Sequence, residues 1–557
     1  MCNNSDNGIG KVWLVGAGPS DPGLFTLRGQ RVLREAEVVL YDALAGQGIA
    51  AMIPEQAERV YVGKRSASHS VPQAQINQLL LDYALAGKRV VRLKGGDPFL
   101  FGRGGEELEL LAEHGIPFEV VPGVSSALAV PAYQGIPVTH RDVCSSVHII
   151  TGHAREGSVS HIDFEALVRT EGTLVFLMGV SSLEGICRGL LDAGMDPDVP
   201  AALLMRGTTA RQERIRASVG TLPEEAARRG AKPPAVIVVG EVCALADRFS
   251  WYEKMPLGGV RILLTQPRER ACRTVERLRT LGAETVLLPT IRTVRRENNT
   301  ALREALHCLE QYQWIVFTSP TGVRIFFEEM RDEGMDVRRL GKSRIAAMGN
   351  GTGRELKKRG LYPDLMPEIY DGEHLGQALA KAGWPGEHVL IPRAAAGNRE
   401  LTDAISHMEV DDIPIYDTVY AEPDAPDGCL AELRNGAFDY VIFTSASCVR
   451  GLVSMIGHAD SCSAEGKSVH GGKNPDRPSA EGKSGHAGEN PDRPEVQDVL
   501  SGIKAVCIGE QTAREAGTFG MQTYVSEKAD TDSLVELLCV VNDPSSEDNE
   551  IATTLFQ

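Results

Sequence analysis

The stretch Arg92–Glu107, RLKGGDPFLFGRGGEE, follows an apolar strand-like run and is rich in glycine. A second stretch of this kind, VWLVGAGPSDPG at Val12–Gly23, runs from a β-branched strand into a glycine-proline turn. Glycine reaches backbone conformations that are closed to other residues, and such turns expose main-chain groups. Together the two stretches predict one small-molecule site built largely from backbone.

The stretch Val12–Gly23 partly matches a dinucleotide-binding fingerprint, because it contains Gly16 and Gly18 and an acidic residue, Asp42, ends the next strand. The match fails because Asp21 stands where the third glycine belongs, and because Pro19 lacks an N–H that a pyrophosphate would use. The stretch Arg92–Glu107 also lacks the Gly-Lys-Ser/Thr ending of a phosphate-binding loop. A phosphate-free ligand with amino, carboxylate and adenosine parts fits better, and S-adenosylmethionine is such a ligand.

Length and composition narrow the class of protein. The chain has 557 residues, which predicts several domains, and 42% of them are hydrophobic and 24% charged. No apolar run approaches the roughly 18 residues of a membrane span, and no signal peptide is evident, so we expect a cytoplasmic protein. The 11 cysteines form no CxxC pair and no cluster with histidine, so neither zinc nor a disulfide framework is predicted.

The net charge of -17 argues against nucleic acid and anionic membranes as partners. A polyanionic small substrate would need local basic clusters, for which Arg92–Lys94 and Arg292–Arg296 are candidates. The ordinary interpretation of such clusters is a solvated surface.

Apolar β-branched runs alternate with helical stretches from Val12 to about Glu241, which indicates an α/β fold. A short proline-glycine stretch then precedes a fresh strand, RILLTQPR, and indicates a domain boundary. We expect a tail at 1–10, a first domain at 11–250, a linker at 251–259, a second domain at 260–542 and a tail at 543–557.

The second half contains an internal duplication. WIVFTSPTGVR at 314–324 matches YVIFTSASCVR at 440–450, and RIAAMG at 344–349 matches KAVCIG at 504–509. The duplication predicts two related α/β lobes with a ligand cleft between them. Two similar polar segments at 463–494 interrupt the second copy, and we interpret them as a disordered surface loop.

Each lobe repeats a strand that ends in Phe-Thr-Ser and runs into a helix. The repeat places Thr318 and Ser319 in one lobe, and Thr444 and Ser445 in the other, where free helix amides can hold an anion. The alternative is ordinary N-capping. Repetition on both sides of a cleft favours a binding role.

The first half resembles the uroporphyrinogen-III C-methyltransferase family. The shared motifs, in family order and spacing, are VGAGPSDPG, VVLYDAL, VGKRSASHSVPQ, VVRLKGGDPFLFGRGGEE, VVPGVSSALAVPAYQGIPVTHR, VFLMG and RGTTARQ. The second half is similar, less closely, to uroporphyrinogen-III synthase through its bilobal pattern, its Phe-Thr-Ser strand ends and IPIYDTVYAEP.

The resemblance implies a two-lobed tetrapyrrole-methylase-type α/β domain followed by a bilobal α/β synthase domain. It implies two consecutive activities: cyclisation of hydroxymethylbilane to uroporphyrinogen III with ring D inverted, and transfer of two methyl groups from S-adenosylmethionine to give precorrin-2, on the route to sirohaem and cobalamin. It also implies a homodimer formed through the methyltransferase half. Two alternatives stay open: a methylase for another corrinoid precursor, and a C-terminal half that only binds tetrapyrrole.

For methyl transfer, the resemblance assigns Asp42 as proton acceptor and Lys64 as proton donor. The alternatives are a strand-end turn for Asp42 and a contact to a substrate carboxylate for Lys64. Asp97 is expected to meet the positive charge of the cofactor, and Ser20 replaces a glycine that is frequent in the family. The residues expected to bind the cofactor are Pro19, Gly95, Gly96, Asp97, Leu100, Ser125, Ser126, Met178 and Gly207.

For cyclisation, the resemblance assigns Tyr416 to assist departure of the substrate hydroxyl. The alternative is a half-buried strand tyrosine. The segment 348–353 departs from the Gly-Pro or Gly-x-x-Thr turn expected of the family. The residues expected to bind substrate carboxylates are Thr318, Ser319, Thr444, Ser445 and Thr512.

Overall fold

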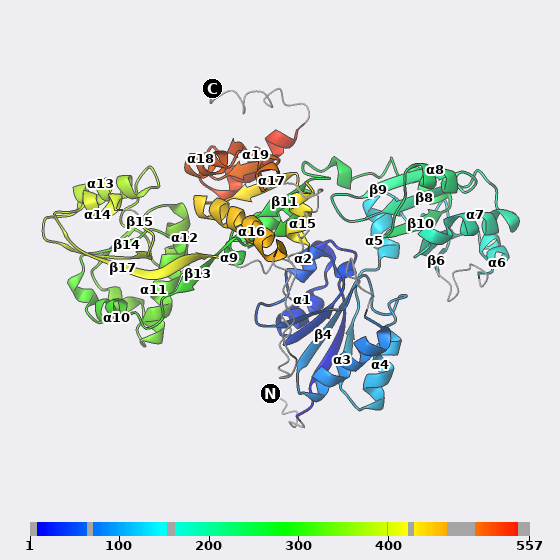
Figure 1. Cartoon of the computed structure of the whole chain (residues 1–557), viewed down its shortest axis with the longest axis horizontal. Coiled ribbons are helices and arrows are strands. Elements are labelled where there is room, and N and C mark those ends of the chain that lie inside the picture. Colours follow the sequence, from blue (N-terminus) through cyan, green and yellow to red (C-terminus); the bar gives the residue numbers. More distant parts are fainter. Residues whose placement is uncertain are drawn as a thin grey trace, which may run out of the picture. The chain divides into compact units, whose positions relative to one another are not determined.

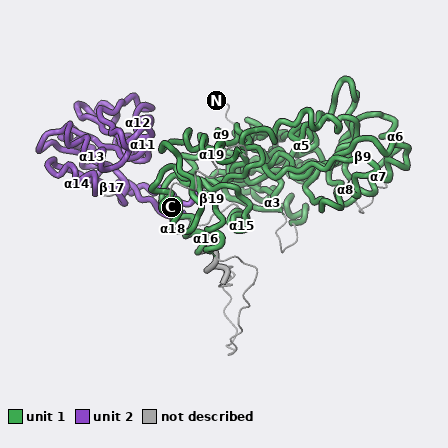
Figure 2. Tube along the Cα trace, turned by 90° about the horizontal axis from the view of Figure 1, so that it is seen from above, with its two compact units in different colours: residues 1–288, 424–557 green, residues 289–423 purple. Residues whose placement is uncertain are grey.

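The computed structural model describes residues 8–63, 71–152, 162–397, 399–421, 428–464 and 496–543. The chain divides into two compact units, which Figure 2 distinguishes by colour. The first unit is formed by Met1–Leu288 together with Asp424–Gln557, and the second is the continuous segment Pro289–Pro423. The helices of the described residues include none that is long and apolar enough to cross a membrane.

The first unit begins with a parallel five-stranded sheet in the order β3-β2-β4-β1-β5. Its strands are β1 (Lys11–Gly16), β2 (Val38–Tyr41), β3 (Glu58–Tyr61), β4 (Arg89–Lys94) and β5 (Phe118–Val121). Side chains along β1, β2 and β4 enter two separate cores on opposite sides of the sheet, so both faces are covered. Helices α3 (Gln73–Leu85) and α4 (Gly104–Glu113) cover one face (Figure 1), and α1 (Leu27–Arg34) and α2 (Gln47–Ala50) cover the other.

A second, mixed sheet follows in the order β6-β7-β10-β8-β9. Only β6 and β7 pair in parallel, whereas β10 pairs antiparallel with β7 and β8, and β8 antiparallel with β9. Its strands are β6 (Val147–Thr151), β7 (Thr173–Leu177), β8 (Pro200–Met205), β9 (Glu213–Ser218) and β10 (Ala235–Val239). Helices α6 (Phe164–Arg169), α7 (Leu183–Asp192) and α8 (Leu222–Arg228) pack on one face, and α5 (Ser126–Tyr133) on the other. The two sheets confirm the two-lobed α/β fold expected for the first half.

The rest of the first unit is a parallel sheet in the order β12-β11-β18-β19-β20. Its strands are β11 (Arg261–Leu264), β12 (Glu284–Leu287), β18 (Tyr440–Phe443), β19 (Lys504–Cys507) and β20 (Gln522–Val525). The accompanying helices are α9 (Arg268–Thr280), α15 (Cys429–Arg434), α16 (Ala446–Ala464), α17 (Val496–Ser501), α18 (Glu510–Thr518) and α19 (Thr531–Asn542).

The second unit is built on one sheet in the order β13-β17-β16-β14-β15, in which only β13 and β17 are antiparallel. Its strands are β13 (Ile291–Arg295), β14 (Trp314–Phe317), β15 (Arg344–Ala347), β16 (His388–Ala394) and β17 (Glu409–Tyr420). Its helices are α10 (Thr300–His307), α11 (Pro320–Asp332), α12 (Asn350–Lys357), α13 (Gly372–Ala382) and α14 (Glu400–Ala404).

The strand order supports the duplication predicted from the sequence. The neighbours β11-β18-β19 in one sheet correspond to β16-β14-β15 in the other, and all of these pairs are parallel. The chain leaves the first of these lobes after β12 and returns to it at Asp424, so the second lobe is one continuous insertion. The bilobal α/β architecture expected for the second half is therefore observed.

The compact units do not coincide with the predicted domains, because the segment 251–259 packs tightly. Tyr252 and Leu257 are buried there, and Trp251 donates a hydrogen bond from its indole nitrogen to the carbonyl of Ala132 (2.9 Å). Hydrogen bonds also join helix α2 to the third sheet, as from Arg261 Nη2 to Gln47 Oε1 (2.9 Å). The linker at 251–259 stays a prediction.

Helix α16 includes the first two residues of the insertion predicted at 463–494. Residues 465–494 lie outside the described part of the chain.

Candidate functional site

The two glycine-rich stretches meet at the ends of neighbouring strands. Gly16, the last residue of β1, pairs with Lys94, the last residue of β4. Just beyond, Gly18 N donates to Gly96 O (3.1 Å) and Gly96 N donates to Gly18 O (2.9 Å). Gly18 and Gly96 have φ of 74° and 67°, which glycine adopts without strain. The structure thus brings together the two stretches that the sequence assigned to one site.

Close backbone packing explains why glycines are needed here. A Cβ on Gly16 would lie 2.5 Å from the Cα of Gly123, and one on Gly123 would lie 2.2 Å from the carbonyl oxygen of Gly96. A Cβ on Gly95 would lie 2.5 Å from that of Leu44. Three strand-end loops therefore approach at distances that no larger residue permits.

Asp97 ties these loops together. Its Oδ1 accepts hydrogen bonds from the amides of Phe99 (2.8 Å) and Leu100 (3.1 Å), and its Oδ2 accepts one from the amide of Gly123 (3.1 Å). A carboxylate with three backbone donors is strongly held. The contacts of Asp97 organise the loop, and its role toward a bound cation stays a prediction.

The second lobe of the methylase-type half reaches the same loops through the motif RGTTARQ. Thr208 Oγ1 donates to the carbonyl of Pro19, and a Cβ on Gly207 would lie 2.4 Å from a methyl carbon of Val130. Ser20, beside Pro19, has φ of 81°. Because that value lies in the left-handed region, it explains why glycine is frequent at this position in the resembled family.

The remaining predicted cofactor residues lie at helix and strand ends. Ser125 is buried and caps α5, with its Oγ accepting a hydrogen bond from the amide of Ala127 (3.2 Å), and Ser126 is the first helical residue. Met178 follows β7 with φ of 56°, and its side chain is 51% exposed. A methionine after an apolar strand would ordinarily pack in the core, so its exposure is consistent with ligand contact.

Asp42 lies at the end of β2 and is held by two donors. Its Oδ1 accepts a hydrogen bond from the amide of Leu44 (3.0 Å), which caps the 3-10 turn Ala43–Ala45, and its Oδ2 accepts one from Arg92 Nη2 (3.1 Å). The strand-end turn considered for Asp42 is therefore present, and its side chain remains 22% exposed. Lys64 lies outside the described residues.

Sequence reasoning missed the environment of Arg92 and Lys94, because it considered them only as a basic cluster for a polyanionic substrate or as a solvated surface. Both side chains are buried beside Glu107, which is fully buried, and Lys94 Nζ lies 2.6 Å from Glu107 Oε1. Burial lowers the pKa of Lys94, and neighbouring Arg92 lowers it further, whereas Glu107 opposes both effects. The signal that could have revealed this was the position of Glu107 on the buried face of the following helix.

The other basic cluster is neutralised by acidic side chains within the second unit. Arg295 pairs with Glu329 and Asp332, and Arg296 pairs with Asp417. These pairs engage the guanidinium groups of Arg295 and Arg296 with carboxylates of the same unit.

In the second unit, Tyr416 and Ser319 form a hydrogen-bonded pair. Ser319 caps α11, its Oγ accepting from the amide of Gly322 (3.0 Å), and lies 2.8 Å from the hydroxyl of Tyr416. Tyr416, on β17, is 6% exposed and belongs to the core. Thr318 is the residue that joins β14 to the cap of α11.

In the first unit, Ser445 caps α16 in the corresponding way, with its Oγ accepting from the amide of Cys448 (3.3 Å). Thr444 directly precedes it, and Thr512 is buried in the first turn of α18. The N-capping alternative is thus observed for both serines. Capping leaves neighbouring amides available, so carboxylate binding at these positions stays a prediction.

The expectation that segment 348–353 departs from the family's turn was wrong. Gly349 caps α12 with φ, ψ of -172°, 178°, and Gly509 caps α18 with -178°, 170°. Each glycine is followed three residues later by a buried threonine, Thr352 or Thr512. Thr352 was missed as a candidate, although Gly-x-x-Thr after matched strands was the available signal.

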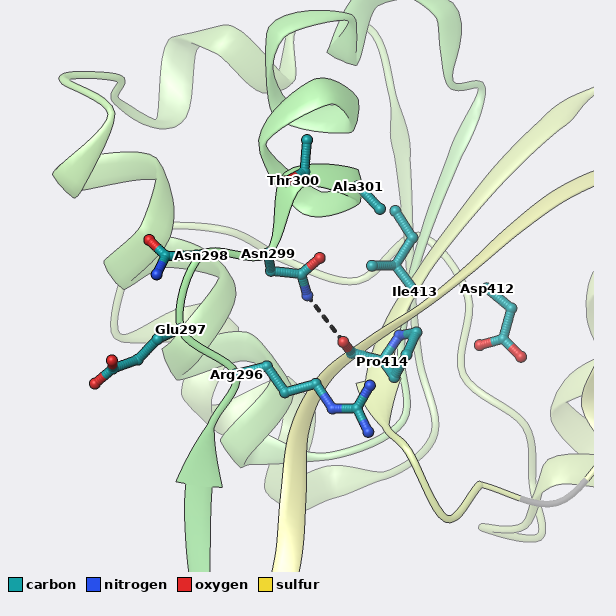
Figure 3. Close-up of a pocket in the computed structure, with 9 residues that line it drawn as sticks. All are labelled: Arg296, Glu297, Asn298, Asn299, Thr300, Ala301, Asp412, Ile413 and Pro414. Atoms are coloured by element: carbon teal, nitrogen blue, oxygen red, sulfur yellow. Dashed lines mark hydrogen bonds between the residues drawn. The ribbon is translucent and has the colours of Figure 1, made fainter.

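The second unit also contains a hollow of about 320 Å³ near the start of α10 (Figure 3). Asn299 donates from Nδ2 to the carbonyl of Pro414 (2.9 Å; Figure 3). Arg296 pairs with Asp417. Arg296 of the basic cluster lines the hollow, but none of the described residues assigned to cofactor, substrate or catalysis does. Its principal polar groups stabilise the surrounding fold, so we assign no ligand to it.

Comparison with known proteins identifies both halves. Residues 11–223 match the family Tetrapyrrole (Corrin/Porphyrin) Methylases, and residues 273–470 match Uroporphyrinogen-III synthase HemD. Siroheme synthase of Ectopseudomonas mendocina (strain ymp) is 51% identical over 44% of the chain, which spans 53% of that relative.

Two solved structures each match part of the chain. A uroporphyrin-III C-methyl transferase from Thermus thermophilus, complexed with S-adenyl homocysteine, is 42% identical over 42% of this chain and 99% of that one, with a TM-score of 0.37. A mutant uroporphyrinogen III synthase, also from Thermus thermophilus, is 20% identical over 50% of this chain and 96% of that one, with a TM-score of 0.33.

A further relative matches the chain along nearly its whole length. The porphyrin biosynthesis protein HemD of Ruminiclostridium josui is 43% identical over 95% of this chain and 97% of its own. The chain therefore belongs to this family of fused proteins, with a tetrapyrrole methylase domain followed by a uroporphyrinogen-III synthase domain.

Proposed function

We propose that the synthase half converts hydroxymethylbilane to uroporphyrinogen III, and that the methylase half transfers two methyl groups from S-adenosylmethionine to that product, giving precorrin-2. The family membership of both halves carries the proposal. It also explains the fusion, because the product of the second half is the substrate of the first. We further propose that the protein works in the cytoplasm as a homodimer formed through its methylase half, which light scattering of the purified chain tests.

The residues around the glycine loops fit S-adenosylmethionine. Gly16, Gly96 and Gly123 pack backbone against backbone, so these loops present main-chain groups to a ligand rather than side chains of their own. Apolar side chains stay exposed in the same motifs, among them Leu44 at 60% and Met178 at 51%, and exposed apolar surface suits an adenine ring or a macrocycle. The residues that we propose hold the cofactor are Pro19, Gly95, Gly96, Asp97, Leu100, Ser125, Ser126, Met178 and Gly207.

When bound, the cofactor supplies an electrophilic methyl group on sulfur. The protein must orient the substrate carbon in line with it and remove a proton from the methylated pyrrole system. We propose Asp42 as proton acceptor, because its carboxylate is fixed by Leu44 and Arg92 and remains partly exposed. We propose Lys64 as proton donor on the resemblance of its motif.

For cyclisation, the proposed role of the protein is to fold the bilane and to assist loss of its hydroxyl group. We propose that the hydroxyl of Tyr416, which is hydrogen-bonded to Ser319, donates a proton to the departing group. We propose Thr318, Ser319, Thr444, Ser445 and Thr512 as contacts for substrate carboxylates, since these residues lie at the starts of helices where amides attract anions.

Replacement of Tyr416 by phenylalanine is expected to lower the cyclisation rate at least about 10-fold, because it removes one positioned donor worth roughly 1–3 kcal/mol. The rate is measured with hydroxymethylbilane as substrate. Tyr420→Phe is the matched control, because it lies on the same strand and is 48% exposed. A Tyr416→Phe variant that cyclises normally, yet unfolds at lower temperature, would show that Tyr416 is only a structural strand tyrosine.

The test of the whole proposal is incubation of the purified chain with enzymatically generated hydroxymethylbilane, with and without S-adenosylmethionine. We expect uroporphyrinogen III alone, and precorrin-2 once the methyl donor is added, identified by chromatography and absorbance. Accumulation of only the non-enzymatic isomer I, with methylation of supplied uroporphyrinogen III intact, would show that the second half does not catalyse cyclisation. It would favour the alternative in which that half only binds tetrapyrrole. Failure to methylate uroporphyrinogen III would point to another corrinoid substrate.

A further inference from the structure

We infer that Arg92 is a positioning residue for methyl transfer, which sets the orientation of the Asp42 carboxylate through a buried charge network. The inference rests on the proposed role of Asp42 and deepens it. Arg92 does not need to touch substrate, because its effect passes through the oxygen of Asp42 that it binds.

The geometry begins with Arg92 itself. Its side chain is 5% exposed on β4, where Nη1 donates to the carbonyl of Leu93 (2.9 Å) and Nη2 donates to Asp42 Oδ2 (3.1 Å). A planar guanidinium held at a second point presents its remaining donor in a fixed direction. Asp42 is thereby bound at both oxygens, by Leu44 on one side and Arg92 on the other.

Behind Arg92 lies a fully buried carboxylate. Glu107, on α4, accepts at Oε1 from Lys94 Nζ (2.6 Å) and Gln73 Nε2 (3.0 Å), with Arg92 Nε 3.5 Å away. The network therefore contains two basic groups, Arg92 and Lys94, and two acidic groups, Asp42 and Glu107. Among the described residues, Glu107 Oε2 is buried and has no hydrogen-bond partner.

A buried network of this kind is a poor way to gain stability alone, because desolvation of its charges offsets much of their attraction. Its distinctive feature is that one of its charged groups, at one end, is exposed to solvent. Arg92, Lys94 and Glu107 are buried, whereas Asp42 is 22% exposed and follows the strand whose end adjoins the glycine loops. The buried part thus acts as a rigid support for the exposed carboxylate.

The test is Arg92→Gln in the full chain, which removes the charge and leaves a shorter polar side chain. We expect kcat for methylation of uroporphyrinogen III to fall by roughly 10- to 100-fold, since misplacement of a reacting group has effects of this order. We expect KM for S-adenosylmethionine to change less than about twofold, because the glycine loops are untouched. Cyclisation is expected to stay unchanged.

The matched control is Arg89→Gln, on the same strand, which breaks an exposed pair with Glu37 (3.3 Å). It is expected to leave methylation unchanged. If Arg92→Gln does not fold, Arg92→Lys replaces it, because lysine retains the charge but not the second anchored donor. Methylation with unaltered kcat in either folded variant, or equal loss of kcat and of cofactor affinity, would overturn the inference.

A double variant separates this inference from the role of Asp42. If Arg92 acts through Asp42, then Arg92→Gln is expected to cost nothing further in an Asp42→Asn background. Full methylation by Asp42→Asn would refute the proposed role of Asp42. Loss in Asp42→Asn with additive further loss in the double variant would refute the inference about Arg92 alone.

Discussion

Replacement of Asp42 by asparagine is expected to reduce methylation of uroporphyrinogen III by at least about 100-fold, because a general base contributes roughly that much or more. Asparagine retains an oxygen that can accept the Leu44 amide, so the turn at the end of β2 is preserved. It cannot take up the proton, and it leaves Arg92 without its anionic partner. The rate is measured with purified uroporphyrinogen III and S-adenosylmethionine.

Cyclisation by the same variant is expected to remain within about twofold of the unaltered protein, because the change is local and distant sites behave independently. Asp163→Asn is the matched control, since Asp163 caps α6 by accepting the amide of Ala166 (2.9 Å). It tests loss of a capping carboxylate elsewhere in the methylase half. Joint loss of both activities in Asp42→Asn would contradict functionally separate halves.

Replacement of Gly123 by alanine is expected to abolish tight binding of S-adenosylmethionine. The new Cβ would lie 2.2 Å from the carbonyl oxygen of Gly96 and 2.7 Å from the Cα of Gly16, and these are backbone atoms that cannot rotate away. The three loops must separate, at an overpacking cost of about 1–3 kcal/mol. Binding is measured by calorimetry, and stability by thermal unfolding.

Gly105→Ala is the control for this experiment. Gly105 lies in the first turn of α4, is exposed, and has no atom within 4 Å of the position its Cβ would take. Alanine there is expected to be neutral or to stabilise by about 0.5–1 kcal/mol, because it restricts the unfolded chain. If Gly123→Ala binds the cofactor as the unaltered protein does, then the loops are not the cofactor site.

Much of the architecture could be predicted from the sequence, because its signals are local. Strand-like runs, glycine turns and repeated Phe-Thr-Ser endings each reflect a few consecutive residues, and they predicted α/β lobes and the meeting of two glycine stretches. Ser319 and Ser445 cap helices for the same reason, because a capping hydroxyl needs only an amide three residues ahead.

Contacts between distant segments were decided by the tertiary structure. Asp97 was expected to face a cation, and the fold brings the amide of Gly123 to it. The ordinary interpretation of Arg92 and Lys94 from sequence was a solvated surface, whereas in the fold Glu107 of α4 lies beside both side chains. Thr352 differs from these residues, because its Gly-x-x-Thr signal was present in the sequence and the like starts of α12 and α18 only made it evident.

By itself, then, the sequence determined the elements, the glycine loops, the duplication and the family, since each depends on short-range pattern. Only the tertiary structure decided which charges are buried and paired, and that the second synthase lobe is inserted between β12 and α15 of the first. The reason is that burial and charge pairing depend on which segments pack together, and no local stretch of chain contains that information.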